Sequence, residues 1–252
     1  MQELSRGDFE RVAHLFDTTQ PNSPMIFATL EGRTLGRAFV DDPNHPTNCL
    51  LVTDFQHFSF THASVDPQWL HATVAALRPQ FGFLLNWSPE MAATLPPPPH
   101  VSRTFLGHEF MEYHAQGELQ LPPDRQVRRM DAALFQRGQW RDLMLSAFGT
   151  VERFLAHGIG VCVMAGDEIC SEAYAAFLGA GKFEVGIVTN EKYRQQGNAY
   201  HACKALLQHI ETTGVPPHWS YFENNVGSAA TARKLGFGAP RAYQWLHYTQ
   251  IR

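Results

Sequence analysis

The segment from residue 183 to residue 199 joins a strand-like run to a polar turn that contains a glycine. Backbone N–H groups at a helix start lack intrahelical partners, carry partial positive charge, and can bind a phosphate that a glycine allows to approach. The turn therefore predicts a pyrophosphate site, although an ordinary polar helix start would use the same residue types. The residues expected at the phosphates are Arg194, Gln195, Gln196, Gly197, Asn198 and Ala199.

The elements on either side of the turn follow from their residue patterns. Glu184–Thr189 is rich in branched residues, which favours a strand. After the turn, apolar residues recur at helical spacing and predict a helix with one buried face, namely Ala199, Cys203, Leu206 and Ile210. This helix is expected to end at Gly214, which two prolines follow. A second strand is predicted over residues 219–222, before the helix-capping residue types Asn225 and Ser228.

Together these motifs resemble the GNAT N-acetyltransferase superfamily. The pattern R-x-x-G-x-A from Arg194 is similar to its acetyl-CoA pyrophosphate loop. The pattern N-x-x-S-x-x-x-A-x-K-L-G-F from Asn225 is similar to its closing helix and Gly-Phe pair. The strand E-V-G-I-V-T from Glu184 and the P-H-W from Pro217 are closer to the subgroup that includes the zwittermicin-resistance acetyltransferase. The resemblance is strong over residues 126–248 and weak before them.

The resemblance implies a mixed α/β fold, with a GNAT-type twisted mixed sheet flanked by helices. Residues 121–252 would form the acetyltransferase domain, and residues 1–120 an N-terminal α/β domain. The implied activity is transfer of an acetyl group from acetyl-CoA to a primary amine, of a small molecule, by direct attack on the thioester. The backbone of Ile187, Val188 and Thr189 would hold the pantetheine arm and polarise the carbonyl. Asn225 and Ser228 would cap the following helix, touch the pantetheine, or do both.

Two residues are predicted to move protons. Glu184 is the first candidate for the base, because it alternates onto the strand face of Gly186, where the superfamily commonly has an acidic base. A strand-edge ion pair would explain the same carboxylate, and Glu172 is the second candidate. The superfamily's usual proton-donating tyrosine is replaced by Ala232. Tyr221 could substitute for it, or could be a core tyrosine whose hydroxyl reaches the surface.

The departure at Ala232 leaves a rival hypothesis open. In that alternative, the chain is a catalytically inactive CoA-binding or scaffolding protein built on a GNAT frame. The cofactor motif also does not distinguish acetyl from longer acyl groups. Turnover of candidate amines would separate an enzyme from a protein that only binds CoA.

The N-terminal part of the chain predicts a second set of elements. Strands are expected at residues 25–30, 34–40, 48–54, 57–63, 81–86 and 101–114, with a helix at residues 67–77. The proline-containing segment 117–124 is the expected domain boundary. No repeat is visible in the residues themselves. The order of elements is nevertheless compatible with a degenerate second copy of the same fold.

Composition limits the partners of the chain. Its 252 residues include 44% hydrophobic residues, which is enough for a sizeable core, and its net charge of −4 argues against nucleic acid as a partner. The basic residues Arg125, Arg128 and Arg129 are expected to be a solvated strand end. The four cysteines lack metal-site or redox spacing, and a buried free thiol is expected where they lie in apolar segments.

Metal, membrane and targeting signals are weak. His108, Glu109, Glu112 and His114 crowd one segment, but on a strand Glu109 points away from the other three, and no H-E-x-x-H pattern occurs. No metal is therefore expected. The charged N-terminus lacks the apolar core of a signal peptide, and no apolar run reaches membrane-spanning length. A cytoplasmic protein with no membrane partner is expected; a homodimer is compatible with the sequence, which does not determine the oligomeric state.

Overall fold

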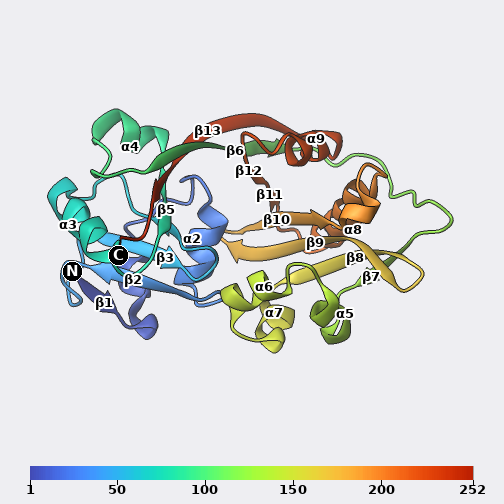
Figure 1. Cartoon of the computed structure of the whole chain (residues 1–252), viewed down its shortest axis with the longest axis horizontal. Helices are drawn as coiled ribbons and strands as arrows, with labels where there is room; N and C mark the ends of the chain where they lie inside the picture. Colours follow the sequence, from blue (N-terminus) through green and yellow to red (C-terminus); the bar gives the residue numbers. More distant parts are fainter. Residues whose placement is uncertain (252) are drawn as a thin grey trace.

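The computed structural model describes residues 1–251 as a mixed α/β fold with two sheets. Figure 1 shows these sheets side by side along the long axis, with β6 (Arg103–Tyr113) and β13 (Phe237–Tyr248) running across the top of both. Two short 3-10 helices, η1 (Arg6–Asp8) and η2 (Glu191–Tyr193), lie in the connections. The mixed α/β fold predicted from the sequence is confirmed.

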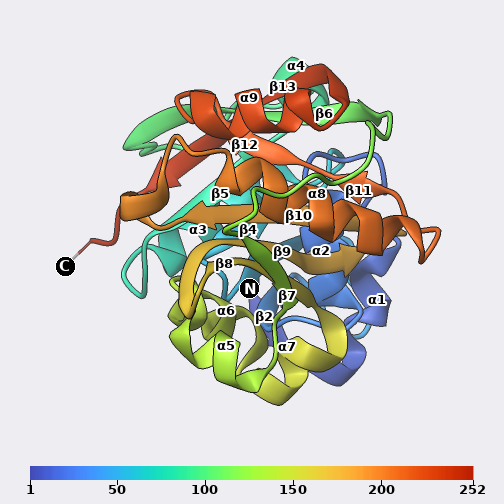
Figure 2. The ribbon, with the colours of Figure 1, turned by 90° about the vertical axis from the view of Figure 1, so that its right-hand side faces the viewer.

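The five-stranded sheet lies between two sets of helices. Its order is β11 (Pro217–His218), β10 (Lys182–Thr189), β9 (Glu168–Gly179), β8 (Ile159–Ala165) and β7 (Gln126–Arg129), and only the β10–β11 pair is parallel. One face packs on α8 (Asn198–Glu211) through the predicted apolar face of that helix. The other face packs on α5 (Ala132–Arg137), α6 (Arg141–Phe148) and α7 (Val151–His157). Figure 2 shows these two helical layers above and below the sheet.

The eight-stranded sheet is built mainly from the N-terminal half. Its order is β1 (Gln2–Leu4), β2 (Gly36–Val40), β3 (Cys49–Thr53), β4 (Phe58–Phe60), β5 (Phe83–Trp87), β13, β6 and β12 (Ser220–Phe222). Only the β4–β5 pair is parallel. The helices are α1 (Glu10–Ala13), α2 (Ser23–Leu30), α3 (Pro67–Leu77) and α4 (Pro89–Thr94), with α9 (Val226–Lys234) following β12.

The two halves repeat one succession of elements. β2, β3 and β4 form an antiparallel series, and α3 leads to β5, which is parallel to β4. In the same way β8, β9 and β10 precede α8 and β11, which is parallel to β10. The last strands are exchanged, because β13 pairs with β5 while β6 pairs with β12. This repetition supports the hypothesis of a second copy, and the boundary near residue 120 stays a prediction.

The predicted strand at residues 25–30 is wrong, because these residues belong to α2. Six of its residues besides Pro24 are buried, so the run is apolar all round, and periodicity alone cannot separate such a run from a buried strand. Pro24 in the first turn favours the helix. α2 packs directly on β9, where a Cβ added to Gly179 would lie 2.3 Å from the backbone nitrogen of Ala28.

The other predicted elements of this half are confirmed with small shifts at their ends. The helix at residues 67–77 is α3, and it begins where the side chain of Asp66 accepts a hydrogen bond from the N–H of Trp69. The strands predicted at residues 34–40, 48–54, 57–63, 81–86 and 101–114 correspond to β2 to β6, and β5 extends one residue further, to Trp87. All four cysteines are buried and free, as expected for those in apolar segments. Within residues 1–251 no helix is both long and apolar enough to cross a membrane.

Candidate active site

The two strands that frame the site separate at Glu184. β11 pairs with β10 only at Phe183 and Glu184, and the β10 ladder shifts register between Glu184 and Val185. The chain then continues as β12, which pairs with β6 instead of β10. Among residues 1–251, this edge of β10 therefore has no strand partner beyond Glu184. A bulge of this kind bends a strand and leaves backbone groups free to meet a ligand.

The carboxylate of Glu184 fills the point of separation. Its Oε1 accepts hydrogen bonds from the backbone N–H of Ser220 at 3.0 Å and from the Ser220 hydroxyl at 2.7 Å. Its Oε2 accepts a hydrogen bond from Nδ1 of His218. In a continuous sheet the N–H of Ser220 would donate to a backbone carbonyl. Here it donates to the side chain of Glu184 instead. Glu184 consequently holds the two strands apart while it remains 7% exposed.

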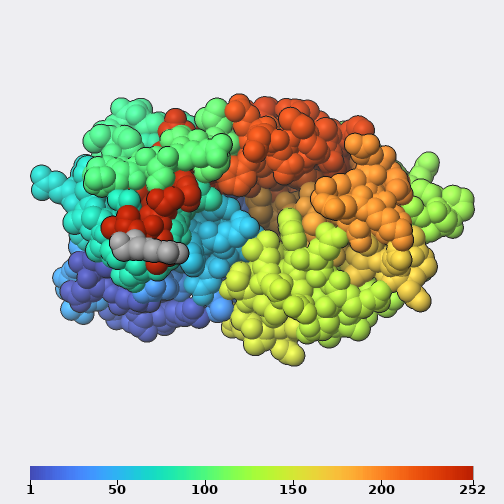
Figure 3. Space-filling view, viewed as in Figure 1, coloured from blue at the N-terminus to red at the C-terminus, as the bar shows by residue number. Residues whose placement is uncertain are grey.

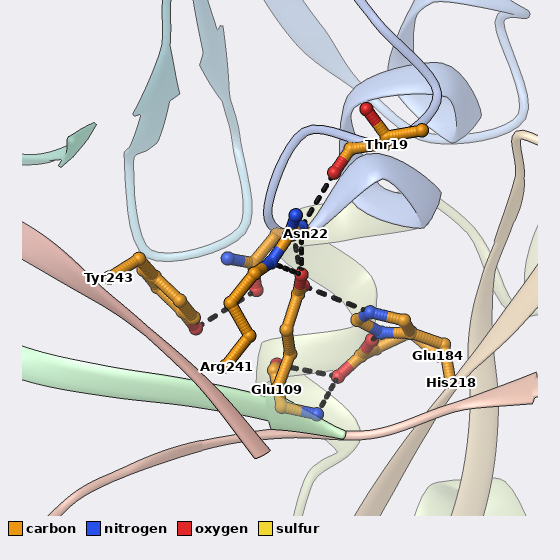
Figure 4. A network of polar contacts seen from close by, with 8 residues as sticks. Thr19, Asn22, Glu109, Glu184, His218, Arg241 and Tyr243 are labelled. Carbon is orange, nitrogen blue, oxygen red and sulfur yellow. Dashed lines mark hydrogen bonds and ion pairs between the residues drawn. The ribbon is translucent and has the colours of Figure 1, made fainter. Parts of the chain in front are cut away.

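His218 links Glu184 to a second buried carboxylate (Figure 4). Its Nε2 lies 3.0 Å from Oε2 of Glu109, which also accepts the N–H of Asn22 at 2.9 Å. Oε1 of Glu109 accepts a hydrogen bond from Nε of Arg241 at 3.0 Å. The cluster of Glu184, His218, Glu109 and Arg241, called the buried relay below, pairs two carboxylates with two cationic side chains.

The electrostatics of the buried relay follow from this arrangement. Burial acts most strongly on His218 and by itself would lower its pKa, but the two carboxylates outweigh burial and raise the pKa to about 9. Burial would raise the pKa of Glu109, but its hydrogen bonds and the charges of His218 and Arg241 hold that pKa below its usual value. His218 is therefore an imidazolium at neutral pH, and both of its ring nitrogens donate.

Glu184 also borders a cavity of about 280 Å³. Its walls come from β9, β10, β12 and β13, from α6, and from the N-terminal half, and most of them are aromatic or aliphatic. We call this cavity the aromatic pocket. In Figure 3 a hollow lies in the middle of the molecule, between the yellow-green helices and the red C-terminal segment. The aromatic pocket brings residues of both halves of the chain to one carboxylate.

The predicted phosphate loop forms a second concavity at the start of α8. Gln195 and Gly197 have φ angles of 60° and 78°, so the loop backbone turns through left-handed conformations before the 14-residue helix. A Cβ added to Gly197 would contact only the ring of His201, at 3.4 Å. The donor groove, as we call this concavity, has a volume of about 560 Å³. Such a helix start suits an anionic pyrophosphate.

The structure brings most of the predicted cofactor-binding residues together in the donor groove. Its lining includes Ile187, Val188, Thr189, Arg194, Gln195, Gly197, Asn198, Ala199, Asn225 and Ser228. Gln196 is outside this lining; its Oε1 instead accepts a hydrogen bond from Arg125 at 3.1 Å. Asn225 caps α9 by accepting the N–H of Ser228 at 3.2 Å. Contacts of these residues with a cofactor stay predictions.

Arg125 corrects one expectation. It was predicted as part of a solvated strand end, but only 12% of its side chain is exposed. Its Nε donates to Oδ1 of Asn198 at 3.2 Å, and its guanidinium lies 5.7 Å from the centre of the Tyr193 ring. Nδ2 of Asn198 donates in turn to the carbonyl of Tyr193 at 3.0 Å. Arg125 therefore braces the loop from β7's side, because the guanidinium can bind several acceptors at once.

The donor groove and the aromatic pocket adjoin one another. Ile187, Asn225 and Ser228 line both, so a ligand arm lying along the free edge of β10 would lead from the loop toward Glu184. The two elements that could hold acetyl-CoA are both present. The start of α8 could bind the pyrophosphate, and the unpaired edge of β10 could bind the pantetheine.

The family model described as GNAT acetyltransferase matches residues 13–246. The chain belongs to this family. It is 30% identical over 131 residues to an N-acetyltransferase of Bacillus subtilis, YdfB, described as uncharacterized; the match spans 50% of this chain and 49% of that protein. In other words, the chain spans about half the length of this curated relative.

Solved structures agree with this GNAT fold. A GCN5-related N-acetyltransferase-like protein from Streptococcus suis superposes with a TM-score of 0.73 at 22% identity, covering 96% of this chain and 98% of its own. A tandem GNAT protein from the clavulanic acid biosynthesis pathway gives a TM-score of 0.61 at 9% identity, covering 100% of this chain and 99% of its own. At these identities the likeness concerns the fold alone.

Within this GNAT frame, the other predicted proton-transfer residues occupy different environments. Glu172 lies outside the aromatic pocket, where its Oε1 accepts the N–H of Gln139 at 2.8 Å and its Oε2 accepts the Tyr174 hydroxyl. Tyr221 lines the pocket and stacks on His108 and Phe110 at centroid distances of 5.3 and 5.2 Å. Ala232 is buried in α9. The geometry thus separates Glu184 and Tyr221, which reach the pocket, from Glu172, which does not.

Several residues of this GNAT site were missed by reading the sequence. His218 is the middle residue of the P-H-W motif and Ser220 directly follows the motif, yet nothing in the sequence indicates that they contact Glu184. For Glu109 the sequence held one indication: strand alternation places its side chain on the face opposite His108. For Arg241 it held none. Among the described residues, no group of three or more His, Cys, Asp or Glu has an arrangement suited to a metal ion.

Proposed function

We propose that this protein transfers an acetyl group from acetyl-CoA to a primary amine of a small molecule. The observation that carries the proposal is that the donor groove and the aromatic pocket share three lining residues, with Glu184 at the pocket and the helix start at the groove. Family membership supports the reaction class. The resemblance of the Glu184 strand and the P-H-W motif to the zwittermicin-resistance subgroup supports a small-molecule acceptor.

Acetyl-CoA supplies a thioester carbonyl that an amine nitrogen can attack. In the proposed donor complex, the N–H groups at the start of α8 and the side chain of Arg194 bind the pyrophosphate. Backbone groups of Ile187, Val188 and Thr189 lie on the free strand edge, where they can hold the pantetheine and polarise the carbonyl. Ser228 keeps its O–H free to donate, because its oxygen accepts from Nε1 of Trp219 at 3.0 Å.

The proposed proton movements use Glu184 and Tyr221. An ammonium group must lose a proton before its nitrogen can attack, and Glu184 is the carboxylate at the pocket that can accept it. The imidazolium of His218 stabilises the negative charge of Glu184 before the transfer. Tyr221 also lines this pocket and is proposed to protonate the departing thiolate, in place of the tyrosine that Ala232 replaces.

The N-terminal half is proposed to shape the acceptor site instead of binding a second CoA. Its counterpart of the phosphate loop is the start of α3, where Pro67 occupies the first turn and Asp66 caps the helix. A carboxylate at this helix start repels a phosphate, and proline removes one N–H donor. This half nevertheless contributes Asn22, Phe55 and Phe58 to the aromatic pocket.

Calorimetric titration with acetyl-CoA tests the proposal, beside dephospho-CoA and ATP as controls. We expect acetyl-CoA to bind with micromolar or tighter affinity, followed by CoA release when an accepted amine is added. Folded protein without binding would overturn the proposal. Binding without turnover of any amine would support the rival hypothesis of an inactive CoA-binding protein.

A further inference from the structure

The wall of the aromatic pocket is a connected set of rings from three parts of the chain. Phe177 of β9 meets Phe55 at a centroid distance of 5.0 Å, and Phe55 meets Phe58 at 5.9 Å. Phe58 stacks on Trp245 of β13 at 4.7 Å, and Phe222 of β12 lies 6.3 Å from Trp245. Aromatic pairs at such distances fix one another's orientation. The wall is therefore a preformed apolar surface.

Opposite this wall, α6 closes the pocket. Trp140, which immediately precedes α6, stacks on Tyr174 at a centroid distance of 5.7 Å. A Cβ added to Gly186 would lie 2.8 Å from the Trp140 ring, so this glycine is required for Trp140 to lie against β10. Leu143, one turn further, is half-buried and lines the same cavity. The space between these side chains and the aromatic wall accommodates a flat, apolar body.

The pocket offers one charged group. Among the described residues that line it, Glu184 alone carries a formal charge; the polar remainder consists of amides and hydroxyls. A carboxylate has about four lone-pair positions, and Ser220 and His218 occupy three of those on Glu184. One position remains for an N–H of an incoming amine. The other carboxylate of the buried relay, Glu109, does not line the pocket and is held by His218 and Arg241.

From this arrangement we infer that the acceptor is a compact primary amine with one positive charge and an aromatic body, of the arylalkylamine class. The inference rests on the proposed function and specifies its acceptor. The ammonium group donates to the free position on Glu184, and the ring lies between Trp140 and the Phe58–Trp245 stack. Aromatic faces favour both the ring and the neighbouring cation.

The same physics disfavours amines with a second charge. A diamine or an aminoglycoside would place an additional cation against apolar walls, with Glu184 already engaged. Burial of an unpaired charge is costly, because no carboxylate compensates for the lost hydration. Amines that are small and polar, such as ethanolamine, would leave the aromatic surface unfilled and gain little from burial.

Calorimetry on the protein saturated with CoA tests the acceptor class without requiring turnover. The probes are 2-phenylethylamine and 1,4-diaminobutane, both primary amines. We expect 2-phenylethylamine to bind at least tenfold more tightly. Equal or tighter binding of the diamine, or binding of neither amine, would overturn the inference. CoA binding is measured in the same samples and tests the donor site. A failure of the acceptor inference can therefore be distinguished from a failure of the proposed function.

Two variants at Leu143 test whether the amines bind in the aromatic pocket. Leu143→Glu adds a second carboxylate at its edge, and Leu143→Gln is the matched change without charge. We expect Leu143→Glu to shift the affinity ratio toward the diamine by about tenfold, while Leu143→Gln leaves the ratio within about threefold of the parent value. Identical ratios in both variants would show that the amines bind elsewhere, and would overturn the assignment of this pocket. CoA affinity and thermal unfolding of both variants are measured alongside to confirm a native donor site.

Discussion

The imidazolium of His218 and the carboxylate of Glu184 form a buried ion pair at the point where β10 and β11 separate. Neither residue is more than 7% exposed. The other ring nitrogen of His218, Nε2, lies 3.0 Å from Oε2 of Glu109. The contact between His218 and Glu184 therefore supports two features at once: the separation of β10 and β11, and the negative charge of Glu184 at the pocket. Loss of His218 would leave two carboxylates facing one another in a site with little water.

The first prediction concerns the pH dependence of stability. Folding raises the pKa of His218 from 6.5 to about 9, so the folded state binds this proton more tightly than the unfolded state. The resulting stabilisation, on the order of 3 kcal/mol, is complete below pH 6.5 and is lost as the pH rises through 9. We expect the difference in free energy of unfolding between the parent protein and His218→Gln to shrink over that range. Urea unfolding at a series of pH values measures it.

A direct titration controls this experiment. NMR of the histidine ring should show His218 still protonated at pH 7.5, because its pKa is raised to about 9. Should the two unfolding curves differ by a constant amount from pH 6 to pH 10, the raised pKa would be contradicted.

The second prediction concerns the base. Glu184→Gln keeps an oxygen for Ser220 but removes the proton acceptor, so kcat should fall by about 10²- to 10³-fold. The affinity for acetyl-CoA should change less than about threefold, because the donor groove lies beyond Ile187. Glu172→Gln is the matched control, since Glu172 is a buried carboxylate on the adjacent strand that does not line the pocket. Steady-state rates and calorimetry measure both effects; full activity of Glu184→Gln would remove Glu184 as the base.

Local patterns were sufficient to predict the turn before α8, α8 itself and the residue that caps α9. The phosphate loop, α8 and the cap at Asn225 depend on residues that lie close together in the sequence. Their positions follow from capping, glycine and periodicity, which are local effects. The same holds for α3, whose first turn is defined by Asp66 and Pro67.

The acceptor side depends on contacts between distant residues. His218 and Glu109 are 109 positions apart, and Arg241 reaches Glu109 from 132 positions away. They meet because β13 inserts between β5 and β6, an exchange of strands that no local pattern encodes. The strand predicted at residues 25–30 was wrong for a related reason: α2 is buried between β9, β10 and α1, so its sequence lacks a polar face and shows no helical periodicity.

The third prediction tests the phosphate loop. Gly197→Glu places a bulky negative charge at the helix start, so we expect CoA affinity to fall at least 100-fold through electrostatic repulsion and steric exclusion. Gly181→Glu is the matched control, because Gly181 has a φ of 68°, no neighbour within 4 Å of an added Cβ, and lies in the β9–β10 turn outside the groove. Both variants carry the same charge and a similar backbone strain. Calorimetry with acetyl-CoA should find the control unchanged; equal affinities of the two variants would contradict the loop assignment.

The last prediction concerns the contact between the two halves. A methyl group at Gly179 would lie 2.3 Å from the Ala28 nitrogen and 2.4 Å from the Pro24 carbonyl oxygen, and backbone atoms cannot move aside as a flexible side chain does. Gly179→Ala should therefore destabilise the protein by about 2–3 kcal/mol, whereas Gly7→Ala, with open space around it, should change stability by less than about 0.5 kcal/mol.

Because Asn22 and Met25, at the start of α2, line the aromatic pocket, a displaced α2 should also raise KM for the amine while leaving CoA affinity within about threefold. Urea unfolding and steady-state kinetics at a temperature where the variant is folded separate the two effects. If Gly179→Ala unfolded like Gly7→Ala, close packing of α2 on β9 would be contradicted; a KM shift without loss of CoA binding would support the N-terminal half as part of the acceptor site.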